Sequence, residues 1–379
     1  MPPDSDCDYL QDILARLLAT PSPSGMTDAA VRLVCAELDV FGVSYDLTRR
    51  GAIRATLRGR HRLPARAIVA HLDTLGAMVK NIRPNGRPEV VPIGFWSSRF
   101  AEGARVTVHS DHGAAHRGTI LPLKASGHTY NKEIDTQPCE WTQLEIRLDA
   151  RTSSAAETRA LGINVGDTID IDPGTEFGPN GYINSRHLDD KAGVAAILTM
   201  IRAVARGEVT PEVDCFALFT ISEEVGVGAS HVLHGEVAEL ISVDNGTLAP
   251  GQTTCEHGVT IAMQDSSGPF DWHLTRHLLA LCTEHGIDHS RDVFRFYRSD
   301  AAAALEAGND LRTALVCFAL DASHGYERTH IDSLLALTTL LTRYVESPPL
   351  FKRDRAPIGP LGDFPPADVQ LGAVPEDGA

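Results

Sequence analysis

Five groups of acidic and imidazole side chains stand out in the sequence as possible metal ligands. They are His71-Leu-Asp73, Asp189-Asp190, Glu223-Glu224, Asp244 and His324. Each group alone is weak evidence, because such residues are more often helix caps, solvated turns or surface loops. However, His71, Glu223 and Asp244 each follow a run that is apolar enough to be buried. A buried carboxylate is costly unless a cation receives it, so a divalent metal ion is the simplest common partner.

The donor atoms and their charges fit a pair of metal ions. The groups offer nitrogen and oxygen without thiolate, which suits zinc, cobalt or manganese. Two divalent ions bring four positive charges, and the carboxylates of Asp189, Glu224 and Asp244 bring three negative ones. A bridging hydroxide would balance the remainder, and it would be a nucleophile because metal binding lowers the pKa of water to roughly 7.

Two further acids fit supporting roles. Glu223 is adjacent to a ligand without being needed as one, which suits the general base that such a nucleophile requires. Asp73 shares a strand face with His71, and a local turn would bring its carboxylate round to the imidazole. It would then accept the second N–H of that ring and fix its tautomer.

The elements that must position these groups alternate between strand and helix. Buried strands are predicted at 67–73, 213–222, 240–244 and 313–321. Helical patterns at 191–205 and 270–285 lie between several of them, so the sequence predicts an α/β fold with a largely parallel sheet flanked by helices. Two more helices are predicted near the N-terminus, one after an N-cap at Asp8 and one between Thr27 and Gly42. Ligands of such sheets bind at the carboxyl ends of the strands.

The pattern changes after the first predicted strand. Residues 81–176 have many Gly and Pro turns and short β-leaning runs, which predicts a β-rich domain inserted into a catalytic domain of residues 1–80 and 177–346. Residues 347–379 contain 7 Pro and 4 Gly in 33 residues. This composition predicts a loosely packed or disordered tail.

Composition excludes several classes of function. The chain has 34 basic and 50 acidic residues, a net charge of −16, which disfavours binding to nucleic acid or anionic lipid. Its apolar runs are shorter than the ~18 residues of a membrane span. Seven scattered cysteines without a CxxC pair argue against a disulfide framework or a thiolate zinc site. The acidic N-terminus is unlike a signal peptide, so we expect a cytoplasmic protein.

The motifs together resemble a known family. In order, HLDTLGAMV, LDDKAG, FTISEEVG, ISVDNG and a late histidine resemble the tetrahedral (glutamyl, deblocking) aminopeptidases of the dinuclear zinc-peptidase clan. The opening Thr20-Pro-Ser-Pro-Ser-Gly25 looks like that family's start, and the likeness runs to about residue 346. The whole chain looks closest to a bacterial subgroup associated with production of the osmoprotectant N-acetylglutaminylglutamine amide.

The resemblance implies a division of roles. It places His71, Asp189 and Asp244 around one metal ion, with Glu224 and His324 around the other and Asp189 bridging. It also implies Glu223 as base, Asp73 as the residue that orients His71, and a cis peptide between Asp189 and Asp190. The insertion would be a dimerisation domain of β-barrel type, and the dimers would assemble into larger hollow particles.

Some residues near the expected pocket depart from the family pattern or have uncertain roles. Lys191 stands where the family usually has Arg, and the segment after EEVG is one residue shorter. Substrate contacts are expected from His128, Arg298 and Asp300. The plainer alternatives are a surface-loop histidine for His128 and a helix N-cap for Asp300.

Three classes of function remain open. The favoured one is a two-metal aminopeptidase acting on short peptides. The second is an amidase or deacylase of a small N-acylated dipeptide or dipeptide amide, and the third is a nonenzymatic assembly module. A glycosidase is disfavoured, because it needs two carboxyls ~5 Å or more apart across a sugar, whereas Glu223 and Glu224 are neighbours.

Overall fold

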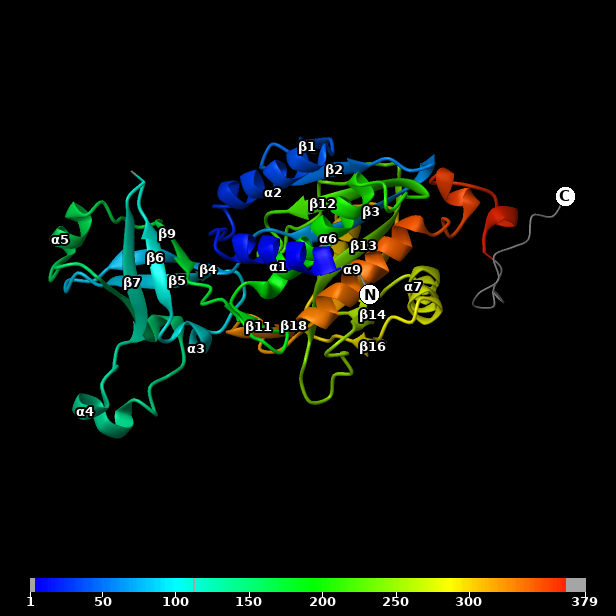
Figure 1. Cartoon of the computed structure of the whole chain (residues 1–379). Helices are drawn as coiled ribbons and strands as arrows, with labels where there is room; N and C mark the ends of the chain where they lie inside the picture. The colour runs from blue at the N-terminus through cyan, green and yellow to red at the C-terminus, as the bar shows by residue number, and fades with distance from the viewer. Residues whose placement is uncertain (1–3, 112, 366–379) are drawn as a thin grey trace.

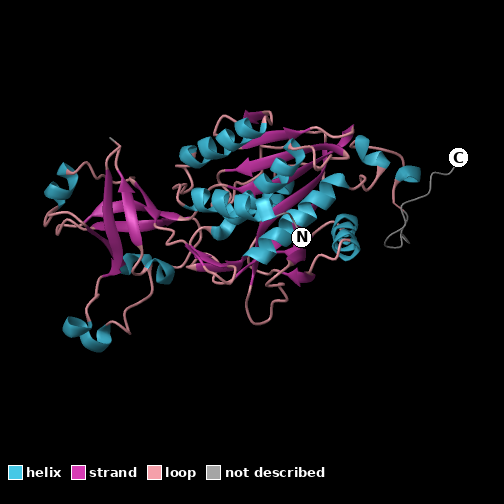
Figure 2. Cartoon of the chain, viewed as in Figure 1, coloured by secondary structure: helices cyan, strands magenta, loops and turns pink. Residues whose placement is uncertain are grey.

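The computed structural model describes residues 4–111 and 113–365, which form a large α/β part and a smaller β-rich part beside it (Figure 1). Colouring by secondary structure separates the two clearly, because helices cover the sheet of the large part and strands dominate the small one (Figure 2). The predicted α/β fold with an inserted β-rich, barrel-like domain is confirmed.

In the described residues, nine strands form the sheet of the large part, in the order β1-β2-β12-β3-β13-β17-β14-β15 with β16 beside β14. Their bounds are β1 Tyr45–Leu47, β2 Ile53–Leu57, β3 His61–His71, β12 Val213–Thr220, β13 Val237–Thr247, β14 Val259–Asp265, β15 Gly268–Pro269, β16 His289–Val293 and β17 Arg312–Leu320. The central strands β12, β3, β13 and β17 are parallel. On either side of these four strands the neighbouring strand is antiparallel, β2 beside β12 and β14 beside β17, so the sheet is mixed.

Helices cover this sheet. They are α1 Asp4–Leu18, α2 Asp28–Phe41, α6 Leu188–Ala205, α7 Trp272–Glu284, α8 Asp300–Glu306 and α9 Ile331–Glu346. Helix α6 packs against β3 and β13 and is covered in turn by α1 and α9. It is almost entirely buried, and its residues are mostly small or aliphatic, as a central helix requires.

The observed ends of the two N-terminal helices agree only in part with the predicted ones. Helix α1 begins before Asp8, so the expected N-cap at Asp8 is wrong; the helix carries Asp8 inside its second turn. Thr27 precedes α2 but its side chain makes no capping hydrogen bond. Gly42 ends α2 with a left-handed backbone (φ +68°), as predicted, because glycine adopts this conformation without steric cost.

The small part is an antiparallel sheet that nearly closes into a barrel, which we call the inserted barrel (residues 76–171). Six strands of the described chain form it in the order β5-β4-β9-β6-β7-β8, and the outer strands β5 and β8 also contact each other. The strands are β4 Gly76–Ile82, β5 Pro88–Ile93, β6 Arg105–His109, β7 Ala115–Pro122, β8 Leu144–Leu148 and β9 Thr168–Ile171, with helices α3 Ser98–Ala101, α4 Gly127–Tyr130 and α5 Ala155–Ala160. It has its own hydrophobic core, which includes Val106 and Ile146.

A small sheet lies between the two parts. It contains β10 Glu176–Phe177, β11 Tyr182–Ser185 and β18 Glu327–His330. Strand β11 leads directly into α6, and β18 leads into α9. This sheet therefore brings the start of α6 close to the segment between β17 and β18.

The first part of the tail differs from the prediction. Arg66, which is almost fully buried, donates to the backbone carbonyl of Ser347 over 2.7 Å, and Arg312 pairs with Asp354 over 2.8 Å. These contacts attach the start of the tail to the large part, so the prediction of loose packing is wrong there. Its remainder, residues 366–379, lies outside the described residues. A search of the described helices finds none long and apolar enough to cross a membrane.

Candidate metal centre

The carboxyl ends of the central strands bring the predicted ligands together. His71 is the last residue of β3, Asp244 lies in β13, and Glu224 follows the end of β12. Asp189 stands at the start of α6, and His324 lies between β17 and β18. Parallel strands present their carboxyl ends at one edge of a sheet, so residues far apart in the sequence meet there.

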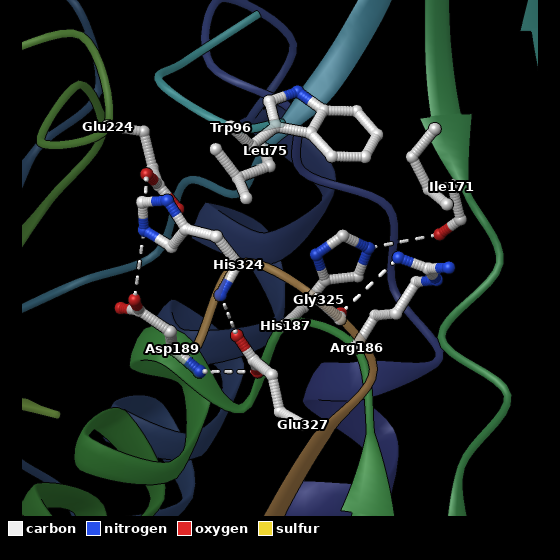
Figure 3. Close-up of a pocket in the computed structure, with 10 residues that line it drawn as sticks. All are labelled: Leu75, Trp96, Ile171, Arg186, His187, Asp189, Glu224, His324, Gly325 and Glu327. Atoms are coloured by element: carbon white, nitrogen blue, oxygen red, sulfur yellow. Dashed lines mark hydrogen bonds and ion pairs between the residues drawn. The ribbon is translucent and has the colours of Figure 1, made fainter. Parts of the chain in front are cut away.

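Asp189 lies at the centre of this cluster. One of its carboxylate oxygens (Oδ1) is 3.1 Å from His71 Nε2, and the other (Oδ2) is 3.3 Å from His324 Nε2. Two sets of three ligand atoms, each within 4.8 Å of one another, share this residue: His71, Asp189 and Asp244 form one, and Asp189, Glu224 and His324 form the other. The second set lines the pocket shown in Figure 3, where His324 lies between Glu224 and Asp189.

The buried carboxyl groups of this cluster make it suitable for binding cations. Burial raises the pKa of Glu224 to about 7. Burial also raises the pKa values of Glu223 and Asp244 well above the ordinary range of a carboxyl. The Oε1 atom of Glu224 is buried without a hydrogen-bond partner. A divalent cation would compensate these carboxylates, since buried charges are otherwise costly.

The imidazoles partly neutralise the acids. Burial lowers the pKa of His324, but Glu224 and Asp189 outweigh it and raise that pKa to about 11. The pKa of His71 is likewise raised well above its ordinary value, against its burial, by Asp189 and Glu223. For Asp189, burial is outweighed by hydrogen bonds from both imidazoles, which lower its pKa. Without metal, the histidines therefore hold the protons that metal ions would replace.

The start of α6 is built to place Asp189. The peptide between Asp189 and Asp190 is cis, as predicted from the resemblance. Asp190 is fully buried, and its carboxylate accepts the backbone N–H of His71 over 3.2 Å. Its other oxygen occupies the space beside Gly193, where an added Cβ would lie 2.3 Å away. Only glycine at position 193 leaves room for this carboxylate.

The structure gives Asp73 a different contact from the predicted one. The ring nitrogen Nδ1 of His71 lies 2.9 Å from the main-chain carbonyl oxygen of Asp73, whereas the carboxylate is 3.7 Å away. The carboxylate instead accepts the backbone N–H groups of Glu223 (3.0 Å) and Glu224 (3.3 Å) and the hydroxyl of Ser24 (2.5 Å). Asp73 therefore holds the turn that carries both glutamates.

Glu223 lies beside the two sets of ligand atoms without belonging to either. Its Oε2 is 3.9 Å from His71 Nε2, and its side chain is 14% exposed, while that of Glu224 is 3% exposed. A carboxylate that is close to the cluster and still reaches the solvent side can exchange protons with a bound molecule. This placement suits a general base.

Sequence reasoning missed Glu327. Its buried carboxylate accepts the backbone N–H of Asp189 over 3.2 Å through one oxygen and that of His324 over 3.0 Å through the other. Figure 3 shows it beneath these two residues. Its spacing of three residues after His324 was the available signal, but an acid in a polar turn has no distinctive pattern.

The three expected substrate contacts are not gathered in one place. His128 is exposed on α4, far from the ligand cluster of the same chain (Figure 1). Arg298 pairs with Glu306 through two contacts of 2.7 and 2.6 Å. Asp300 is buried at the start of α8, accepts the hydroxyl of Thr220 over 2.9 Å, and has its pKa raised by burial to about 6. Their roles toward substrate stay predictions.

Comparison with known proteins gives close matches over most of the chain. A family model described as M42 glutamyl aminopeptidase matches residues 51–340. The Bacillus subtilis (strain 168) protein "Putative aminopeptidase YhfE" is 36% identical over 337 residues, covering 89% of this chain and 97% of that protein. Glutamyl aminopeptidase of Lactococcus lactis subsp. cremoris is 28% identical over 227 residues, covering 59% of this chain and 62% of that protein.

Solved structures share the fold. The TET aminopeptidase of a marine sediment archaeon of the Thaumarchaeota superimposes with a TM-score of 0.81 at 17% identity, covering 90% of this chain and 97% of that one. The TET1 peptidase of Pyrococcus horikoshii, described as assembling into a tetrahedron or a large octahedral shell, gives a TM-score of 0.78 at 22% identity, with 89% and 99% covered. The matches extend over both parts of the molecule.

Proposed function

This chain belongs to the M42 glutamyl aminopeptidase family of metal-dependent peptidases, and we propose that it removes the first residue of short peptides with two divalent metal ions. The observation that carries the proposal is the position of Asp189, whose two carboxylate oxygens face different imidazoles. A carboxylate shared by two three-residue sets is what a pair of closely spaced metal ions requires.

The residues of the site divide the work. His71, Asp189 and Asp244 would hold the first ion, and Asp189, Glu224 and His324 the second. When bound, the ions polarise the scissile carbonyl and lower the pKa of water. Their donor set of nitrogen and oxygen favours zinc, with cobalt or manganese as alternatives.

Glu223 carries the proton transfers. It takes a proton from the attacking water and donates it to the amine that leaves. Asp73 keeps Glu223 in place, because its carboxylate accepts the N–H of Glu223 over 3.0 Å. The attacking water and the leaving amine therefore meet the same side chain, the water at the start of the reaction and the amine at its end.

One observation favours the alternative of an N-acylated dipeptide substrate, such as an acetylated dipeptide amide of the osmoprotectant type. An aminopeptidase anchors a free α-amine, commonly on a carboxylate that has no other partner. Here both oxygens of Asp73 accept from the Glu223 and Glu224 amides, and Asp300 is fully buried, with one oxygen accepting from Thr220 and the other beside Gly228. An acylated substrate would need no such anchor.

A matched pair of substrates separates the alternatives. Gln-Gln amide with and without an N-acetyl group is incubated with the protein loaded with zinc, cobalt or manganese, and Glu223→Gln protein is the control. We expect turnover of the free amine only. Preference for the acetylated compound would assign the amidase alternative, and no turnover of either or of longer free peptides would favour the assembly module.

We also propose that the inserted barrel is a dimerisation domain. The barrel projects from the large part, and most of its strands and its helices α4 and α5 lie away from that part (Figure 1). Structural relatives are described as a dodecamer and as tetrahedral or octahedral shells, which supports an assembly built from copies of this chain. A self-complementary two-fold surface is the commonest closed contact.

A further inference from the structure

A short segment of the inserted barrel, residues 94–96, lies against the second set of ligands. The main-chain carbonyl oxygen of Phe95 is 2.7 Å from His324 Nδ1. A carbonyl oxygen only accepts, so Nδ1 must carry a hydrogen, and Nε2 is the nitrogen that presents a lone pair toward Asp189 and Glu224 once the ring gives up its second proton. This contact selects the tautomer that can bind a metal ion through Nε2.

The same segment approaches Glu224 at a glycine. Gly94 has φ +82°, and a Cβ added to it would lie 2.5 Å from Leu75 Cδ2, 3.4 Å from the Glu224 carbonyl oxygen and 3.5 Å from Glu224 Cβ. The segment therefore contacts His324 directly, and a methyl group added at position 94 would reach Glu224 at ordinary contact distance. A larger residue at position 94 would displace Leu75, which lines the same pocket as Glu224 and His324.

The turn that carries His324 has further contacts with the barrel. Arg186 donates to the Phe100 carbonyl oxygen over 2.8 Å and to the Gly325 carbonyl oxygen over 3.3 Å, which joins helix α3 to this turn. Gly325 also faces the Phe100 ring, where an added Cβ would lie 3.1 Å from the ring edge. The backbone that follows His324 is thus held against the barrel.

The segment itself is held by aromatic side chains. Trp96 donates its indole N–H to the Gly76 carbonyl oxygen over 3.0 Å, and Trp141 donates to the Trp96 carbonyl oxygen over 3.3 Å. The two rings pack edge to face with centroids 4.8 Å apart. Such pairing fixes the segment to the body of the barrel.

The first set of ligands is supported differently. His71 Nδ1 faces the Asp73 carbonyl oxygen, and the Asp244 carboxylate accepts the backbone N–H of Asn245 over 2.6 Å. All these residues belong to the strand ends of the large part. Apart from the shared Asp189, the ligands of the two candidate metal positions are therefore supported by different parts of the fold.

We propose that segment 94–96 of the inserted barrel positions His324 and Glu224, so that metal affinity at the second position depends on the barrel while affinity at the first does not. This inference rests on the proposed two-metal site. It makes Phe95 a positioning residue that acts through its main chain, and it connects placement of the barrel with the completeness of the active site. A shift of the barrel would weaken one ion and leave the other bound.

Two glycines allow a matched test. Gly94→Ala places a methyl group against Leu75 and Glu224, whereas Gly103→Ala lies in the same barrel, has the same φ of +82°, and has nothing within 4 Å of an added Cβ. Both changes put alanine at the same unfavourable φ, so the difference between the two variants reports the contact. Trp96→Phe is a second variant, which loosens the segment without adding bulk because it removes the indole hydrogen bond and part of the ring that packs on Trp141.

The measurement is the titration of metal-free protein with Co²⁺, followed by calorimetry and by visible absorption. Glu224→Gln and Asp244→Asn proteins show which binding step belongs to which position. We expect Gly94→Ala to weaken the step lost in Glu224→Gln by about tenfold or more and to leave the other step unchanged. Trp96→Phe should shift the same step in the same direction, and Gly103→Ala should match the parent.

Three results would overturn the inference. If Gly94→Ala weakens both binding steps equally, the change reports a general loss of structure. If both binding steps are unchanged in Gly94→Ala and in Trp96→Phe, segment 94–96 has no influence on metal affinity. An effect of Gly103→Ala as large as that of Gly94→Ala would assign the change to backbone strain. If the parent protein binds only one ion, the proposed two-metal site itself is refuted. The same titration thus distinguishes a failure of the two-metal site from a failure of the inference about the barrel.

Discussion

Glu327 and Asp189 are joined by a buried hydrogen bond, in which the backbone N–H of Asp189 donates over 3.2 Å to a carboxylate oxygen of Glu327. The second oxygen of Glu327 accepts the backbone N–H of His324 over 3.0 Å. One side chain thus fixes the backbone of the shared ligand and of a ligand from another segment. Neither contact involves the metal-binding atoms themselves, so the support can be tested separately from the ligands.

The first prediction concerns this support. In Glu327→Gln, one acceptor oxygen becomes an NH₂ group that faces an N–H donor, so one of the two hydrogen bonds is lost. We expect metal affinity to fall by roughly 10-fold or more, the usual scale for residues that orient ligands. Calorimetric titration with Co²⁺ measures it, and the exposed Glu208→Gln is the control. Unchanged affinity in Glu327→Gln would show that the two backbone bonds are not needed.

The second prediction separates the adjacent glutamates. Glu223→Gln should keep the fold and most of the metal affinity but lose turnover by about 10²-fold or more, because the proton acceptor is gone. Glu224→Gln should instead weaken one metal ion. Metal content and turnover are measured on the same samples. Equal loss of metal in both variants, with comparable activity per bound metal, would contradict this assignment.

The third prediction concerns pH. Without metal, the pKa of His324 is about 11 and that of Glu224 about 7, so both hold protons in weakly acidic solution. Metal binding requires the deprotonated ligands and must expel these protons. Metal affinity should therefore rise as pH increases from about 5 to about 8, with protons released on binding. Calorimetry in buffers of different ionisation enthalpy counts them. Loading without proton release would be incompatible with these ligands.

The fourth prediction concerns assembly. If the inserted barrel carries the dimer surface, replacing residues 81–176 with a short Gly-Ser linker should convert dimers or larger particles into monomers. Sedimentation and light scattering measure the mass, and circular dichroism checks that the large part is folded. Dimers that persist in a folded deletion protein would place the interface on the large part.

The fold class and the set of residues that meet at the strand ends could be predicted from residue types and their order. His71, Glu224 and Asp244 follow or interrupt apolar runs that can only be buried strands, and parallel strands place their carboxyl ends at one edge. An apolar run and the polar residue beside it are neighbours in the sequence, so this pattern can be recognised without the structure. Asp189 and His324 stood out by residue type, and the family resemblance added the division of all five ligands between two metal ions.

The tertiary structure alone decided how those ligands are held. The supporting contacts are made by main-chain atoms and by residues distant in the chain: the Asp73 carbonyl oxygen under His71, the Phe95 carbonyl oxygen beside His324, and the Glu327 carboxylate between two backbone N–H groups. Every residue has a carbonyl oxygen and nearly every one an N–H, so side-chain type gives no signal for such partners. They become visible only when folding brings the barrel, the small sheet and the strand ends into contact.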